Sequence, residues 1–241
     1  LMGGTTFDTP KPVELLSRML KMITFQDRDA IILDFFSGSA TTAHAVMQLN
    51  AEDGGSRKFI MAQLPERTDE KSEAFKAGYK NICEIGRERI RRAALKIAED
   101  HPGSHFDGGF RVLKIDSTNM KDVYYRASEY SQEMLPGLES NIKDDRTDLD
   151  LLFGCLTDWG LPLSLPYKSG QIDGCTVHNY SNGALIACFD EKVPDSVFLG
   201  IAKKQPQRAV FRDSCFENSP SRINVTEIFR NMAPDTEIKV L

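Results

Sequence analysis

The sequence predicts an α/β fold in which a parallel sheet is followed by a second, smaller α/β unit. Short apolar segments at residues 29–36, 58–64 and 110–115 have the composition of strands. Helical patterns of apolar residues at 41–50 and 78–99 stand between them. Strands that alternate with helices form right-handed crossover units. The three strands are therefore expected to lie parallel in one sheet.

Local signals place the helices and strands of this first part, residues 1–120. Pro12 is followed by apolar residues at helical spacing, which predicts a helix that starts near Pro12. Gly108 and Gly109 precede the clear alternation of 110–115. The helix over 78–99 has an apolar side made of Ile82, Ile85, Ile90, Ala93, Ala94 and Ile97.

Residues 121–148 are polar and of mixed composition, which indicates a linker with some helix. Residues 149–241 then form the smaller α/β domain. Its strongest signal is Asn182-Gly183, a two-residue turn that predicts a hairpin of strands 175–179 and 184–189. Apolar patterns further predict helices at 149–159, 197–204 and 225–232, and strands at 208–212 and 237–241.

Bulk composition excludes several classes of protein. The 241 residues are 41% hydrophobic and 27% charged, as in ordinary globular proteins, and no apolar run is long enough to cross a membrane. A net charge of −5 argues against a chain that coats nucleic acid through bulk electrostatics. Five scattered cysteines without a Cys-x-x-Cys pair predict neither a disulfide framework nor a metal site. The expected location is the cytoplasm.

The basic segment from Arg87 to Lys96 allows two interpretations. Glutamates interleave with its arginines, which is typical of a solvated helix face. Alternatively, the arginines form a ridge near a nucleic-acid phosphate backbone.

The stretch Asp34-Phe35-Phe36-Ser37-Gly38-Ser39-Ala40-Thr41-Thr42 is the strongest candidate for a functional site. It predicts a buried strand, a loop of small residues and the start of a helix, an arrangement that brings a ligand close to backbone N–H groups. The stretch lacks the Gly-Lys-Ser/Thr ending of a Walker A loop and the full Gly-x-Gly-x-x-Gly pattern. On these residues alone, an ordinary strand-to-helix turn is an equal alternative.

This stretch resembles the S-adenosylmethionine (SAM) loop of DNA amino-methyltransferases, whose usual form is Asp-Phe-Phe-x-Gly-Ser-Gly-Thr-Thr. Thr9-Pro10-Lys11-Pro12 resembles the Lys-Pro motif that precedes this loop in the β class. Further segments are similar to the modification (Mod) subunit of type III restriction-modification systems, at residues 57–66, 85–93, 159–163, 183–190 and 210–214. The resemblance covers essentially the whole chain and implies a partial Rossmann-like methyltransferase sheet plus a C-terminal α/β domain.

The resemblance implies that the loop contacts the methionine part of SAM. Asp34 would orient the loop or accept a hydrogen bond from the ammonium group. Thr41 and Thr42 would cap N–H groups or bond the carboxylate. Close N–H groups would come from Ser37, Gly38 and Ser39, where a side chain at position 38 would obstruct the cofactor.

Four further residues are implied to contact SAM. Thr9 and Lys11 would reach the carboxylate from the opposite side. Gln63 ends the second strand, where this fold places a residue on the ribose hydroxyls. Phe36 would flank the adenine or, equally well, belong to the core. No metal is expected.

Two departures from the family pattern matter. Ala40 replaces the usual second glycine, which is harmless if its φ is helical and strained if its φ is positive. The catalytic Asp/Asn/Ser-Pro-Pro-aromatic tetrad, which holds the flipped base, is missing, and Asn218-Ser219-Pro220-Ser221 does not qualify. In the β-class order the tetrad and the target-recognition region would precede Leu1. No catalytic residue is therefore assigned, and the chain alone is expected to be inactive.

The resemblance implies an intact bacterial enzyme that methylates the N6 group of adenine in DNA, with DNA and a restriction (Res) subunit as partners and a homodimer as its assembly. The C-terminal domain would serve dimerisation or contact with the Res subunit. An alternative is that the chain is a non-catalytic interaction domain for the same assembly.

Overall fold

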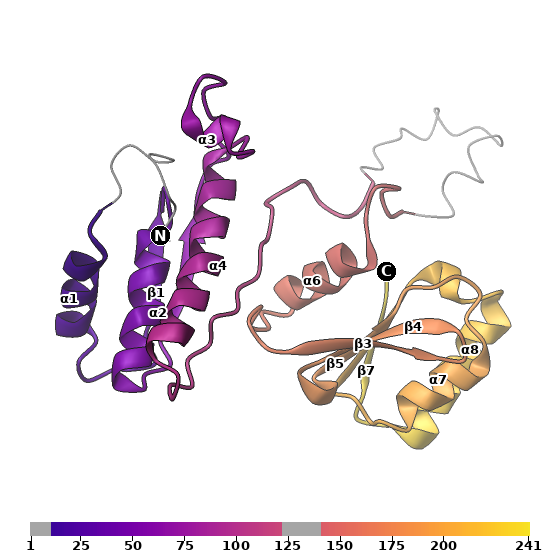
Figure 1. Cartoon of the computed structure of the whole chain (residues 1–241). Helices are drawn as coiled ribbons and strands as arrows, with labels where there is room; N and C mark the ends of the chain where they lie inside the picture. Colours follow the sequence, from indigo (N-terminus) through magenta and orange to yellow (C-terminus); the bar gives the residue numbers. More distant parts are fainter. Residues whose placement is uncertain (1–10, 122–140) are drawn as a thin grey trace. The chain divides into compact units, whose positions relative to one another are not determined.

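The computed structural model describes residues 11–121 and 141–241 (Figure 1). Thr9 and most of the linker expected at 121–148 lie outside these residues. The chain divides into two compact units, Leu1–Val112 and Leu113–Leu241, and each is described by itself. None of the helices in the described ranges is long and apolar enough to cross a membrane.

The first unit is built on two parallel strands joined by a helix. Strand β1 (Ile31–Phe35) pairs with β2 (Lys58–Ala62), and helix α2 (Thr41–Asp53) connects them. Helix α1 (Val13–Ile23) packs against α2, and the short α3 (Glu73–Lys76) precedes the long α4 (Ile82–Asp100) (Figure 1).

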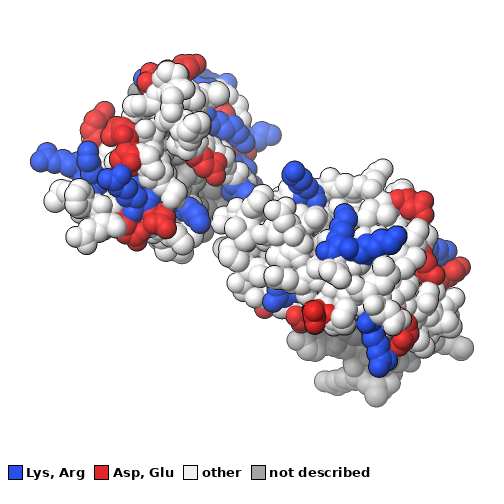
Figure 2. Space-filling view, turned by 90° about the horizontal axis from the view of Figure 1, so that it is seen from below, with Lys and Arg blue, Asp and Glu red and all other residues white. Residues whose placement is uncertain are grey.

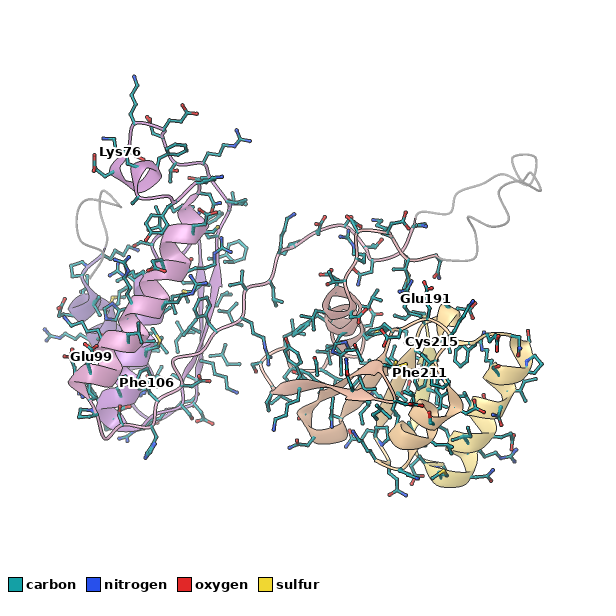
Figure 3. The ribbon with its side chains drawn as sticks, turned by 45° about the vertical axis from the view of Figure 1, so that its right-hand side comes forward. Lys76, Glu99, Phe106, Glu191, Phe211 and Cys215 are labelled. Atoms are coloured by element: carbon teal, nitrogen blue, oxygen red, sulfur yellow. The ribbon has the colours of Figure 1, made fainter. Side chains whose placement is uncertain are left out.

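Helices α2 and α4 cover one face of this sheet. Phe59 and Met61 of β2 point into the core that these helices form. Phe106, which follows α4, packs against the same core (Figure 3). The buried members of this core are Ala40, Ala43, Met47, Ile90, Ala93 and Ile97.

The opposite face of the sheet is apolar but exposed. Ile31, Leu33 and Phe35 of β1 and Ile60 of β2 alternate with the residues that face the helices. Each of these four side chains is more than half exposed. Within the first unit, none of the described residues 11–112 covers this face, although apolar sheet faces are normally buried.

The predicted strand at 110–115 is wrong. Residues 107–116 have no strand pairing. Phe110 packs beside α4 with the Arg91 guanidinium 5.6 Å from its ring centre, whereas Val112, Leu113 and Ile115 are exposed. Alternation makes a segment suitable for a sheet, but a strand also requires a neighbour to pair with. The described sheet of this unit therefore has one crossover instead of two.

The second unit has a five-stranded mixed sheet in the order β3-β4-β5-β6-β7. The first three strands are antiparallel and the last three are parallel. The strands are β3 (Tyr167–Ile172), β4 (Cys175–Tyr180), β5 (Leu185–Cys188), β6 (Arg208–Phe211) and β7 (Glu237–Val240), and the helices are α6 (Asp148–Asp158), α7 (Asp195–Ala202) and α8 (Ser219–Met232).

Helices cover both faces of this second sheet. Ile186 and Phe211 point to the side of α7 and α8, whereas Leu185 and Val210 point to the side of α6. Phe211 and Cys215, labelled in Figure 3, belong to the α7–α8 core. The predicted mixture of helices and strands is thus confirmed for both units.

Local details of the second unit follow the sequence signals with three differences. The hairpin is confirmed, but Tyr180 pairs with Leu185, so residues 181–184 connect β4 and β5 in place of the predicted two-residue turn, with Asn182 and Gly183 at positive φ. Helix α8 starts six residues earlier than predicted, because the Asn218 side chain caps it by accepting from the Ser221 N–H. Strand β3 was missed, since Tyr167-Lys-Ser-Gly-Gln-Ile is too polar to resemble a buried strand.

Candidate functional site

The loop between β1 and α2 has an unusual backbone. Phe36, Gly38 and Ala40 all have positive φ, at 73°, 54° and 58°. The N–H groups of Phe36 and Ser37 both donate to the carbonyl oxygen of Ala62, at 2.9 and 3.1 Å. The loop is thereby fixed over the end of β2. Sequence analysis left open whether Ala40 has a helical or a positive φ. The structure shows a positive φ, so the backbone at Ala40 is strained.

Gly38 and Gln63 are in direct contact although 25 residues separate them. The Gly38 N–H donates to Oε1 of Gln63 at 2.7 Å. The amide nitrogen of Gln63 donates to the Leu64 carbonyl oxygen at 3.2 Å. The end of β2 therefore holds the centre of the loop.

Asp34 fixes the start of α2 to the end of β1. The Thr42 hydroxyl donates to Oδ2 of Asp34 at 2.5 Å. Oδ1 of Asp34 has no hydrogen-bond partner within the ranges that the structure covers. This carboxylate is half-buried, so it combines a fixed position with one free acceptor.

Ser39 and Thr41 lie deeper than the other loop residues. Both are buried, and their hydroxyl oxygens are 3.3 Å apart. Helix α2 begins at Thr41 without a side-chain cap, since Ala40 at the N-cap has no polar group. The first N–H groups of α2 have no partner inside the helix, as at any helix start.

Helix α4 contributes two residues that the sequence analysis did not single out. A Cβ at Gly86 would lie 3.3 Å from the Gly38 carbonyl oxygen and 3.5 Å from the Ala40 Cβ. Nη1 of Arg89 donates to Oγ of Ser39 at 3.1 Å. The available signal was the small residue Gly86 in the interior of a helix, which indicates close approach of another backbone.

Of the remaining predicted residues Thr9, Lys11 and Phe36, the two that the structure describes are not among those that hydrogen bonds between side chains and the loop bring together. Thr9 lies outside the described residues. Lys11 is exposed just before α1. Phe36 is 64% exposed, and its ring meets Phe35 edge to face at 5.4 Å. The structure thus brings Asp34, Gly38, Thr42 and Gln63 together around one loop.

His44, one turn into α2, is electrically neutral at neutral pH. Burial lowers its pKa to about 4, and the positive charges of Arg89 and Lys96 act in the same direction. Its Nδ1 atom is buried without a hydrogen-bond partner within the described ranges.

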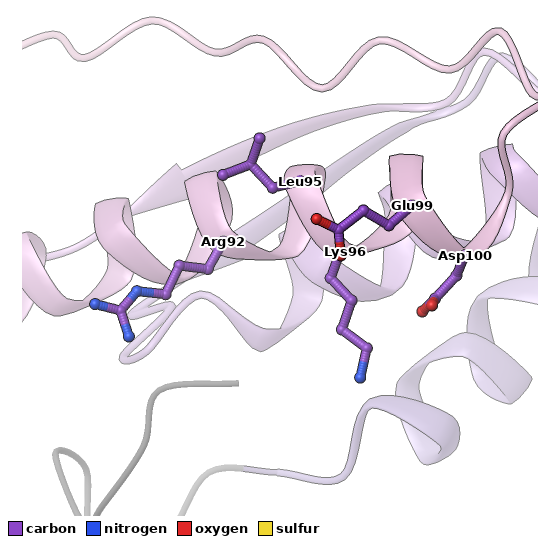
Figure 4. A pocket seen from close by; sticks show the side chains of 5 residues that line it. All are labelled: Arg92, Leu95, Lys96, Glu99 and Asp100. Atoms are coloured by element: carbon purple, nitrogen blue, oxygen red, sulfur yellow. The ribbon is translucent and has the colours of Figure 1, made fainter.

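The basic segment of α4 has the character of a solvated helix face. Arg91 and Arg92 form ion pairs with Glu88, at 3.6 and 2.8 Å. Figure 2 shows lysines and arginines interspersed with acidic residues on the face that it presents. A hollow on the later part of α4 is lined by Arg92, Leu95, Lys96, Glu99 and Asp100 (Figure 4). Its charges are mixed, and none of its residues belongs to the loop.

Comparison with known proteins shows which proteins this chain is similar to. Residues 3–94 match a family model described as DNA methylase. The chain is 44% identical over 140 residues, 58% of its length, to the StyLTI Mod subunit of Salmonella typhimurium, a type III restriction-modification enzyme. It is 29% identical over its whole length to the EcoPI Mod subunit of Escherichia phage P1, and 29% identical over 97% of its length to the EcoP15I Mod subunit of Escherichia coli.

The chain is similar to the type III Mod subunits. It covers 19%, 37% and 35% of these three proteins, so it spans little more than a third of their length at most. The resemblance to Mod subunits that the motifs indicated is therefore confirmed, and the DNA methylase match includes the whole loop.

Proposed function

We propose that this chain is the SAM-binding part of a cytoplasmic bacterial DNA adenine-N6 methyltransferase of type III, with a partial Rossmann-like sheet. The observation that carries the proposal is the loop from Phe36 to Ala40. Three of its residues have positive φ, and it leads directly into the start of α2, where N–H groups without an intrahelical partner can meet a ligand. The relation to Mod subunits gives this loop its ligand class.

The residues around the loop fit SAM. The uncapped start of α2 suits the carboxylate, and Oδ1 of Asp34 suits the ammonium group. Gln63 stands at the strand end and can exchange its bond to Gly38 for a ribose hydroxyl. Phe36 is exposed enough to meet the adenine ring. Lys11 and Thr9 remain candidates for the carboxylate.

SAM supplies an activated methyl group that can be transferred by direct displacement. The residues of this chain would orient that group, because such a transfer depends on alignment more than on a strong base. They do not supply the group that holds the adenine, since the sequence has no Pro-Pro tetrad. The apolar face of β1 and β2, which no described residue of the first unit covers, agrees with a domain that is completed by further polypeptide.

The first test is calorimetric titration of SAM into the chain and two variants. Gly38→Trp should abolish binding, because the side chain would occupy the cofactor space at a positive φ. Gly54→Trp is the matched control, since Gly54 has φ 68° at the other end of α2 with no atom within 4 Å of a Cβ. Equal loss in both variants, or unchanged binding in Gly38→Trp, contradicts the proposed site.

The chain alone should transfer no methyl group to DNA. The measurement is incorporation of labelled methyl from SAM into DNA that carries adenines in varied contexts. Transfer by the wild-type chain that disappears in Gly38→Trp would show that the catalytic groups are present after all.

A second function is proposed for the unit Leu113–Leu241. The DNA methylase match ends at residue 94, whereas the similarity to the EcoPI Mod subunit extends over the whole chain. This unit is therefore shared with type III Mod subunits beyond the methylase part. We assign it to Mod dimerisation or to docking of the Res subunit. Native mass spectrometry of the chain, with and without the Res subunit, tests this assignment. A chain that stays monomeric and does not bind the Res subunit contradicts it.

A further inference from the structure

Helix α4 lies against the loop at one turn. At Gly86 the helix approaches the Gly38 carbonyl so closely that a Cβ would have to displace a neighbour. Three residues later, on the same side, Arg89 reaches the loop and donates to Ser39 at 3.1 Å. Ser39 in turn lies 3.3 Å from Thr41, hydroxyl to hydroxyl. A chain of polar groups thus runs from α4 to the first residue of α2.

Arg89 differs from Arg91 and Arg92 of the same helix. Arg91 and Arg92 pair with Glu88, but Arg89 has no acidic side chain within 4.0 Å in the described ranges. Its Nε atom is buried there without a hydrogen-bond partner. A charge that is partly removed from water without a counter-charge is costly. Burial correspondingly lowers the pKa of Arg89.

The positive charge of Arg89 acts at the start of α2. Burial is the largest cause of the lowered pKa of His44, and the charge of Arg89 is the next largest. The helix start adds its own partial positive charge at the same place. An anionic group placed beside this loop would therefore be favoured by two independent sources of positive potential.

We propose that Arg89 is a positioning residue for the cofactor loop. Its guanidinium holds Ser39, and through it Thr41, so that the N–H groups at the start of α2 face the carboxylate end of SAM. This inference rests on the function proposed above. It predicts that Arg89 matters for ligands with a carboxylate and not for the adenosine end of the same ligand.

The test compares two ligands, SAM and 5′-methylthioadenosine, which lacks the amino-acid part. Arg89→Met should weaken SAM binding about tenfold, as expected for the loss of one charge-assisted contact. Its affinity for 5′-methylthioadenosine should stay within about twofold of the wild type. Arg89→Lys should recover part of the SAM affinity. Arg91→Met, on the same helix, is the matched control and should change neither affinity.

A second measurement does not depend on any ligand. Amide hydrogen exchange at residues 39–42 should be faster in Arg89→Met than in Arg91→Met, because the loop loses its anchor. Equal losses for both ligands, or unchanged exchange in these amides, overturn the proposal. A wild-type chain that binds neither ligand would refute the SAM-binding function, and the exchange data alone would then decide whether Arg89 holds the loop.

Discussion

Ala40 shows at the scale of one residue how the loop departs from its family pattern. It has φ 58° and is 2% exposed, at a position where the related motif has glycine. The left-handed conformation costs an alanine about 1–2 kcal/mol. The loop keeps this strain because bonds on both sides fix it, from Ser37 to the end of β2 and from Thr42 to Asp34.

Ala40→Gly should therefore be nearly neutral for stability. Relief of the strain offsets the loss of a buried methyl group, about 0.8 kcal/mol, and the greater freedom of glycine in the unfolded chain. Ala43→Gly, in the first turn of α2, is the matched control because Ala43 is fully buried and helical. It should cost about 2 kcal/mol. Urea unfolding measures both, and equal losses would show that Ala40 carries no strain.

Sequence analysis selected Gln63 as a site residue from its place at the end of a strand, but the contacts within the site were predictable only between residues that are close in sequence. Asp34 and Thr42 are only eight residues apart and share a hydrogen bond. The strand–loop–helix pattern predicts the positions of both residues. The bond from Gly38 to Gln63 spans 25 residues, and that from Arg89 to Ser39 spans 50. Such contacts depend on how α4 and β2 pack, which no local pattern encodes. Arg89 was therefore seen only as one of several arginines in a basic segment.

At the scale of elements, local signals were sufficient where they were strong. Pro12 places the start of α1, and Asn182-Gly183 gives the turn between β4 and β5. Sequence reasoning failed for the two segments whose state is set by a partner. Residues 110–115 alternate but have no strand beside them, whereas the polar β3 becomes a strand because β4 pairs with all six of its residues. Pairing over long range thus outweighs intrinsic preference.

The two sheets differ at the scale of the whole molecule. The sheet of the second unit is buried on both faces, and three cysteines lie in its cores: Cys155 on the α6 side, Cys188 and Cys215 on the other. Burial raises their pKa to about 11 for Cys155 and about 12 for the other two. The thiolate is the reactive form of cysteine. These thiols are therefore protected from reagents in two ways: reagents cannot reach them, and their raised pKa keeps them protonated.

Alkylation with iodoacetamide at pH 8 should consequently separate the five cysteines into two groups. Cys83 and Cys175 are partly exposed, and burial raises their pKa less than in the core, so both should react in the native protein. Cys155, Cys188 and Cys215 should react only when urea opens the second unit. Peptide mass spectrometry gives the order. Early labelling of Cys188, which is fully buried on the central strand β5, would contradict a second unit packed on both faces of its sheet.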